Sequence, residues 1–219
     1  MTQPPSRALF NRTHSLDIAA AAIFIALSAI LSAYLTPLLP RVPSFGIAII
    51  DPISTIWMIC FLVFGWRSGF LTLAVGSLLL FFFDPTGIGP IFKFLATLPL
   101  MVVPFLWYEA SRRKGRFEGS LQQWCMPMKH FVPSMVIGWL GRVALMILCN
   151  VVVFLTLYAG FLKYATLALI GLPDVTGWEA VIWVTVLINT WQTIVDTVFP
   201  YVIAFKIVEK YGQSGALHT

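Results

Sequence analysis

The amino-acid sequence predicts an all-α integral membrane protein with six transmembrane helices in a single bundle. Hydrophobic residues make up 59% of the 219 residues and charged residues only 11%, with a mean hydropathy of +0.88. Soluble domains carry about 25% charged residues. Apolar stretches recur along the chain, and about 20 apolar residues cross the roughly 30 Å hydrocarbon core of a bilayer. The basic residues also gather in alternate connections, as a multi-pass protein of the cell membrane requires.

Turn residues and polar breaks separate the expected spans. The first span ends where Pro37 and Pro40 stop a helix. The third ends at the turn signal Asp84-Pro85-Thr86-Gly87. A polar N-terminus, residues 1–15, is expected to be flexible, residues 16–210 form the membrane domain, and residues 211–219 form a tail. The six spans are expected at residues 16–36, 52–64, 68–83, 90–110, 131–158 and 179–206.

The basic residues predict that both termini are cytoplasmic. With six spans, ten of them lie at the two termini, in the 65–67 turn and in the 111–130 connection. Three lie on the other side, namely Arg41, Lys93 and Lys163. Positive charge is enriched on the cytoplasmic side of membrane proteins. The basic cluster at residues 112–116 has a second interpretation, which is binding to anionic lipid.

No catalytic or metal-binding motif is evident. The sequence contains no HExxH and no Walker motif, and its three histidines lie in polar segments. Cys60, Cys125 and Cys149 are too scattered for a CxxC pair. We therefore expect a non-catalytic protein without cofactor, catalytic residue or bound metal. The net charge of +5 is explained by topology, so the lipid bilayer and not nucleic acid is the expected surrounding partner.

Polar residues inside the spans are the first candidates for function, because they are costly in hydrocarbon. Asn189, Gln192 and Asp196 are three and four residues apart, so they share one helix face that should point into the bundle. Arg142 lies on the fifth span at a depth where it can pair with Asp196. Interhelical hydrogen bonding that only fixes the packing is the alternative, and the sequence leaves open whether this pair is structural or functional.

A site that opens to the outside is expected between the external ends of the spans. Lys93, Asn150 and the loop at residues 41–51 lie in the external half. Aromatic residues at this depth would give a planar ligand a flat surface, or would simply pack in the core or face lipid; these are Phe45, Trp57, Tyr158 and Trp183. The predicted substrate-binding residues are Phe45, Asp51, Lys93, Asn150, Tyr158, Asn189 and Gln192.

Small residues recur four apart in the first span, at Ala22 and Ala26 and again at Ala29 and Ala33. Such spacing lets two helices approach closely in a membrane. It is equally compatible with packing inside the chain and with docking of a partner.

Several short motifs together resemble a known family. They are the alanine pair of the first span, the proline-rich loop that leads to Ile50-Asp51-Pro52, then Phe64-Gly65-Trp66-Arg67-Ser68-Gly69, Thr86-Gly87-Ile88-Gly89, and Asn150 followed by Leu157-Tyr158. This order resembles the substrate-binding S components of energy-coupling factor (ECF) transporters over residues 16–210, and it looks most like the riboflavin-specific branch.

The resemblance implies a subunit that captures a small vitamin from the outside, with riboflavin favoured, and that works with a transmembrane T component and two ATPase subunits. It implies that Ala22 and Ala26 contact the T component, that the loop from Pro37 to Asp51 closes the pocket, and that Asn150 binds the ligand. The riboflavin branch tends to carry a Glu-x-x-Asn element after the glycine pair, where this chain has Pro90 and Lys93. Another vitamin or precursor is therefore the alternative, and Lys93 suggests an acidic or carbonyl-rich ligand.

Two functions of a different class stay open. A membrane enzyme that modifies lipid or prenyl groups would need paired carboxylates, and Asp51, Asp84 and Asp174 form no DxxD pair. A structural subunit of a larger membrane complex needs no such motif.

Overall fold

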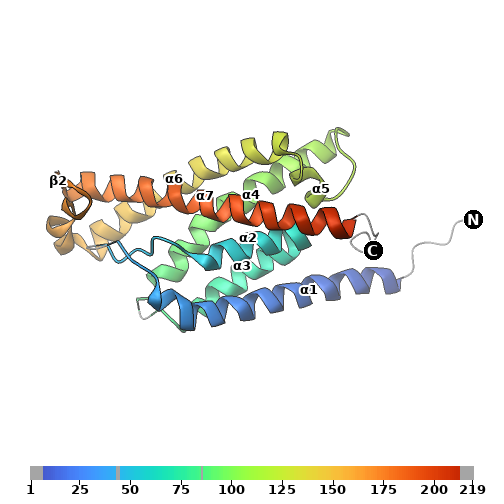
Figure 1. Ribbon diagram of the computed structural model, residues 1–219, viewed down its shortest axis with the longest axis horizontal. Helices are drawn as coiled ribbons and strands as arrows, with labels where there is room; N and C mark the ends of the chain where they lie inside the picture. The colour runs from blue at the N-terminus through green and yellow to red at the C-terminus, as the bar shows by residue number, and fades with distance from the viewer. Residues whose placement is uncertain (1–6, 43–44, 85, 213–219) are drawn as a thin grey trace, which may run out of the picture.

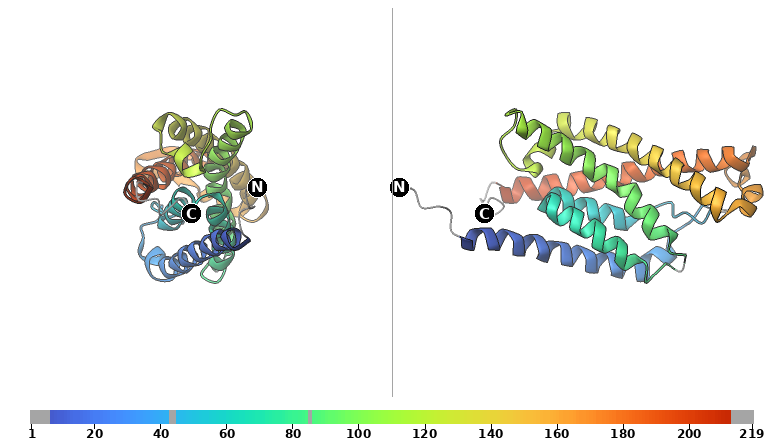
Figure 2. Two further views of the ribbon diagram at one scale, coloured as in Figure 1. Left: turned by 90° about the vertical axis from the view of Figure 1, so that its right-hand side faces the viewer. Right: turned by 180° about the vertical axis from the view of Figure 1, so that it is seen from behind.

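The computed structural model describes residues 7–42, 45–84 and 86–212. Its long helices run side by side along one axis, so that the start of α1 and the end of α7 lie at the same end (Figure 1). We call this the terminal end. The opposite end, the loop end, holds the described residues of the three connections 36–51, 81–87 and 157–176 (Figures 1 and 2). Of the expected tail at residues 211–219, residues 211 and 212 belong to the last helix, and residues 213–219 lie outside the described part, as do the first six residues.

The first helix begins earlier than expected. Helix α1 spans Arg7–Ile30, continues as a π-helical turn over Leu31–Leu35, and ends in a 3₁₀ turn over Thr36–Leu38. Residues 7–15, which the sequence places in a flexible N-terminal segment, are helical. These residues contain no glycine or proline, so nothing in them stops the helix. The end at Pro37 agrees with the expectation.

Six apolar helices lie close to the expected positions. They are α1, α2 (Pro52–Phe64), α3 (Trp66–Leu80), α4 (Ile88–Arg113), α6 (Met128–Thr156) and α7 (Gly177–Gly212). In the described residues, four segments are long and apolar enough to cross a membrane, namely Ser15–Leu38, Ile88–Arg113, Met128–Thr156 and Gly177–Lys210. Helices α2 and α3 have 13 and 15 residues and are shorter than a full span. The six-span count and the side of the termini therefore stay predictions.

Helix α2 forms much of the centre of the bundle. It contacts α7, α3 and α1, and the side chains of Ile53, Trp57, Met58 and Phe61 are fully buried. The Trp57 indole donates to Ser28 Oγ of α1 over 2.8 Å. Trp57 therefore fills the core between α1, α2 and α3 and offers no surface to a ligand.

A single glycine joins α2 to α3. Gly65 has φ of 94°, a left-handed conformation that favours glycine, and its N–H donates to Phe61 O. One turn later, Gly69 approaches α2 so closely that a Cβ atom there would lie 2.7 Å from Phe61 Cβ and 2.8 Å from Phe61 Cα. The two glycines thus allow the two short helices to pack as a tight antiparallel hairpin.

A short amphipathic helix closes the terminal end of the core. Helix α5 (Leu121–Cys125) begins with a capping box, in which Ser120 Oγ accepts from Gln123 N and Gln123 Oε1 accepts from Ser120 N. The side chains of Trp124 and Cys125, on the inner face of this helix, are buried. Burial raises the pKa of the Cys125 thiol to about 12, so this cysteine stays protonated and behaves as an apolar core residue.

The connection between α6 and α7 has more structure than expected. It contains 3₁₀ turns over Ala159–Tyr164 and Ala168–Ile170 and two short antiparallel strands, β1 (Thr166–Leu167) and β2 (Leu172–Thr176). Nearby, the loop after α1 folds back on itself through an isolated bridge between Arg41 and Ala48. Both segments lie at the loop end.

Replacing Gly69 by alanine is expected to destabilise the protein by about 1–3 kcal/mol, because the new Cβ would overlap the backbone and side chain of Phe61. Thermal unfolding of the purified protein in detergent measures this loss. Gly141→Ala is the matched control, since its Cβ would meet Pro99 Cβ at an ordinary 3.4 Å. An equal melting temperature for the two variants would contradict the close approach of α2 and α3.

Candidate functional site

The loop before α2 carries an ion pair to α4. Lys93 Nζ lies 2.9 Å from Asp51 Oδ1 and 2.8 Å from Asp51 Oδ2. Asp51 is also the N-cap of α2, where Oδ1 accepts from Ile53 N at 3.1 Å and Oδ2 accepts from Ser54 Oγ at 3.3 Å. The Lys93 and Asp51 side chains are only 16% and 12% exposed. The structure thus brings together two residues that the sequence placed in the site separately.

A second ion pair lies deeper in the bundle, between α6 and α7. Arg142 Nη1 donates to Asp196 Oδ2 at 2.8 Å, and both side chains are 1% exposed. The same guanidinium donates from Nε to Asn189 Oδ1 at 3.0 Å and from Nη2 to Gln192 Oε1 at 2.9 Å. The α7 face expected from the spacing of Asn189, Gln192 and Asp196 therefore points at a single arginine.

Thr55 joins the two ion pairs. Its hydroxyl donates to Asp196 Oδ1 at 3.0 Å and lies 3.4 Å from the carbonyl oxygen of Asp51. We call the connected set of Asp51, Lys93, Thr55, Arg142, Asn189, Gln192 and Asp196 the polar network. Thr55 was not among the predicted site residues. Its signal in the sequence was weak, because a threonine inside an apolar helix usually bonds to its own backbone.

The polar network also holds the loop that covers it. Gln192 Nε2 donates to the carbonyl oxygen of Ala48 at 2.8 Å. The loop is further shaped by hydrogen bonds from Val42 N to Ile47 O and from Ile49 N to Pro40 O. The Gln192 amide therefore bridges the loop backbone and the buried Arg142, using one end for each.

An apolar cluster lies beside the polar network, closer to the loop end of the bundle. It has a buried centre of Ala165, Leu167, Ala180, Val181 and Val184, and Phe45 and Ile47 from the loop pack against it. Aromatic side chains continue the cluster, with Phe154 6.2 Å from both Tyr158 and Trp178 between ring centroids. The predicted residues Phe45 and Tyr158 thus lie among apolar groups contributed by the loop and by the connection between α6 and α7.

Two other residues singled out in the sequence lie apart from the polar network. The amide nitrogen of Asn150 donates to Met146 O of its own helix, and among the described residues Asn150 makes no hydrogen bond to the polar network. Trp183 is 50% exposed and faces outward. The partners of these residues depend on how the neighbouring helices are rotated, which spacing along one helix does not give.

The predicted docking alanines of α1 face away from the bundle. Ala22 and Ala26 are exposed, whereas Ala21 and Ser28 on the opposite side of α1 are fully buried. Packing inside the chain therefore does not account for this small-residue pair. The surrounding surface of α1 is apolar, with Ile23 66% exposed.

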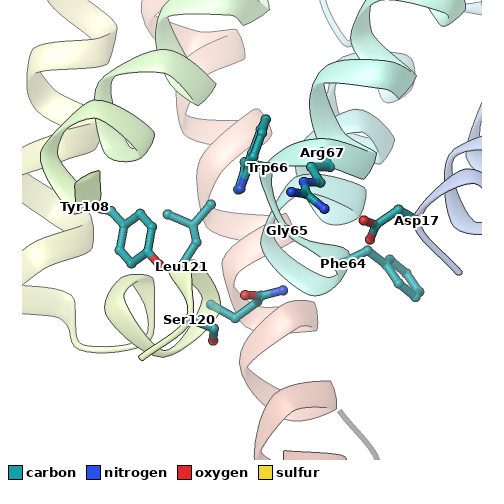
Figure 3. A pocket seen from close by; sticks show the side chains of 9 residues that line it. Asp17, Phe64, Gly65, Trp66, Arg67, Tyr108, Ser120 and Leu121 are labelled. Atoms are coloured by element: carbon teal, nitrogen blue, oxygen red, sulfur yellow. The ribbon is translucent and has the colours of Figure 1, made fainter. Parts of the chain in front are cut away.

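A separate recess of about 240 Å³ opens at the terminal end (Figure 3). Asp17 of α1 and Arg67 of α3 lie on one side of it, and Tyr108, Ser120 and Leu121 lie on the other. The guanidinium of Arg67 lies 5.2 Å from the centroid of the Trp66 ring. None of the predicted substrate-binding residues lines this recess.

The comparisons with known proteins identify the family. A family model described as the substrate-specific component of ECF transporters matches residues 16–205. The chain belongs to this family. No curated protein matches the chain, and no solved structure matches it either.

Family membership gives the general role. The substrate-specific component binds a small molecule in the membrane, and the T and ATPase components of the transporter are its partners. Such components are generally non-catalytic. In the described part of the chain, no group of three or more His, Cys, Asp or Glu side chains could hold a metal ion.

Replacing Gln192 by methionine is expected to loosen the loop over the polar network, because the hydrogen bond to Ala48 O is lost. One such bond contributes about 0.5–1.5 kcal/mol, so exchange of the amide hydrogens of residues 45–51 should rise about two- to tenfold. Hydrogen–deuterium exchange with mass spectrometry measures this change.

Asn189→Leu is the control for Gln192→Met. Asn189 also accepts from Arg142, but its amide nitrogen donates to Thr185 O and not to the loop. Equal exchange in the loop of both variants would show that Gln192 does not hold the loop.

Proposed function

We propose that this chain is the substrate-capture subunit of an ECF-type vitamin importer, with riboflavin as its substrate. The observation that supports this most is the polar network, which places two ion pairs inside the helix bundle and is joined by Gln192 to the loop after α1. Buried polar groups in a membrane protein are costly and usually mark a binding site or a transport path. Both termini are proposed to be cytoplasmic, so that the loop end faces the outside.

The substrate is proposed to bind between the polar network and the apolar cluster. Asp51, Lys93, Asn189 and Gln192 would contribute polar contacts, and Phe45 and Tyr158 would contribute aromatic surface. Asn150 lies on α6 between Arg142 of the polar network and Phe154 of the apolar cluster. It would exchange its hydrogen bond to Met146 O for one to the ligand. A planar molecule with a polar edge and an apolar body fits this division, which supports riboflavin alongside the sequence resemblance.

The proposed mechanism is binding without catalysis. The buried side-chain nitrogen and oxygen atoms of the described residues all have hydrogen-bond partners. A ligand therefore enters when the loop opens, exchanges hydrogen bonds with the network, and is enclosed when the loop returns. ATP hydrolysis in the partner subunits then drives the release of the ligand to the inside.

The purified protein is expected to bind riboflavin with a Kd below about 1 μM, and to carry flavin absorbance if the vitamin co-purifies. Isothermal titration measures the affinity. Asn150→Leu should weaken binding about tenfold through loss of one ligand hydrogen bond. Thr156→Val is the control, because this hydroxyl is exposed on the same helix and bonds to Val152 O.

Absence of both flavin absorbance and heat on titration would remove riboflavin as the substrate and leave the family membership intact. Mass spectrometry of the small molecule released from the protein would then identify the vitamin.

Docking to the T component is proposed to use the exposed alanine pair of α1. Ala22→Trp should abolish vitamin uptake by the complete transporter, because a bulky side chain prevents close helix packing, and should leave substrate binding by the isolated subunit unchanged. Uptake into proteoliposomes and titration of the subunit measure the two effects. Leu148→Trp, at a position of α6 that is 60% exposed, is the control. Full uptake by Ala22→Trp would show that the docking face lies elsewhere.

A further inference from the structure

We propose that the substrate of this chain is electrically neutral. This inference deepens the proposed function and rests on the loop end as the place where the substrate binds. It depends on the charged side chains at the loop end and on the ion pairs and hydrogen bonds that each of them already makes.

The polar network contains two cations and two anions, and each cation lies against one anion. Lys93 pairs with Asp51 and Arg142 pairs with Asp196, both with a closest N–O distance of 2.8 Å. The network therefore has no net charge. A charged substrate bound beside it would be a buried charge without a partner, which is strongly unfavourable in a medium of low dielectric constant.

A substrate anion could in principle take Lys93 from Asp51. The structure disfavours this exchange, because Asp51 is fixed independently of Lys93. Its carboxylate caps α2 by accepting from Ile53 N and Ser54 Oγ, and a helix N-terminus favours a negative charge. Asp51 would therefore stay in place, and the substrate anion would bind next to it. Repulsion between the two would offset the attraction to Lys93.

Arg142 is likewise already bound to partners within the protein. Its guanidinium donates to three different side chains, Asn189, Gln192 and Asp196, and its side chain is 1% exposed. A substrate anion at this arginine would leave Asp196 buried without its cation. Within the polar network, the amides of Asn189 and Gln192 and the hydroxyl of Thr55 can exchange partners without changing the charge balance. Asp51 and Lys93 keep this balance as long as they contact a substrate while paired with each other.

The remaining charges at the loop end do not change this balance in favour of an anion. Four of them are exposed, two basic and two acidic, namely Arg41, Lys163, Asp174 and Glu179. Asp84 is partly buried and accepts from Thr86 N and Thr86 Oγ1. The described charges of the loop end therefore sum to minus one, and this excess belongs to Asp84, whose carboxylate is already engaged by Thr86 of its own turn.

The pairing of Lys93 changes what its presence in the sequence means. Alone, a lysine in the outer half of a span suggests an acidic ligand, and this was the hypothesis from the sequence. Paired with Asp51, it instead belongs to a neutral unit. A ligand rich in carbonyl and amide groups still fits, because such groups bind to amides and hydroxyls without adding charge.

Titration with matched neutral and charged vitamins tests this inference. Riboflavin and riboflavin 5′-phosphate share one ring system, and the phosphate adds a charge of about −1.5 to −2. Pyridoxal and pyridoxal 5′-phosphate form a second pair. In the pair that binds, the uncharged member should bind at least about 100-fold more tightly, because the phosphate would be buried without a cation.

Three results would overturn the inference. The charged member of a pair could bind as tightly as the neutral one, or the ligand released from the purified protein could be a charged vitamin such as biotin, pantothenate or thiamin. In both cases the proposed capture of a vitamin would stand and only the neutral class would fail. If no vitamin binds at all, the proposed function fails and this inference fails with it.

A pair of variants tests the charge balance directly, by their affinity for whichever neutral vitamin binds to the protein. Lys93→Met leaves Asp51 without a cation, whereas Lys93→Met combined with Asp51→Asn restores neutrality and keeps an N-cap residue at α2. The double variant should bind the vitamin at least tenfold more tightly than Lys93→Met alone. Equal weakening of the two would show that Lys93 binds the substrate through its charge. Melting temperatures without ligand show whether each variant is folded.

Discussion

The buried ion pair between Arg142 and Asp196 connects more of this protein than any other interaction described above. It joins α6 to α7, and through Thr55 and Gln192 it reaches α2 and the loop after α1. Removing one partner of such a pair typically costs about 3–5 kcal/mol, because the other charge stays buried alone. The arrangement of three helices and one loop around the proposed site therefore depends on both charges being present.

The polar network also depends on the close packing of α2 against α3. Gly65 turns the chain in one residue and Gly69 lets the helices touch, so α2 lies deep in the bundle although it is short. This depth brings Thr55 against Asp196, and it lets Asp51 at the start of α2 face Lys93 of α4. The segment Phe64–Gly69, one of the motifs that resemble the family, lies at the terminal end. Through the packing of α2 it thus positions side chains at the loop end.

Much of this architecture could be predicted from the sequence, and the limits have physical causes. Hydropathy located the six apolar helices, and the spacing of Asn189, Gln192 and Asp196 correctly predicted a shared face and a partner in Arg142. Residue spacing within one helix could not pair Asp51 with Lys93, which depends on the path of a loop. Nor could it show that Trp57 packs in the core or that Asn150 bonds to its own helix, since both depend on helix rotation.

The complete pairing of buried side-chain polar atoms in the described residues has a consequence for any molecule that enters the bundle. Atoms that already have protein partners need no internal water molecules to satisfy them. A water molecule or ligand that enters the polar network must therefore take over hydrogen bonds that the protein groups now make with one another. The paired interior thus sets the free-energy cost that any entering molecule has to offset.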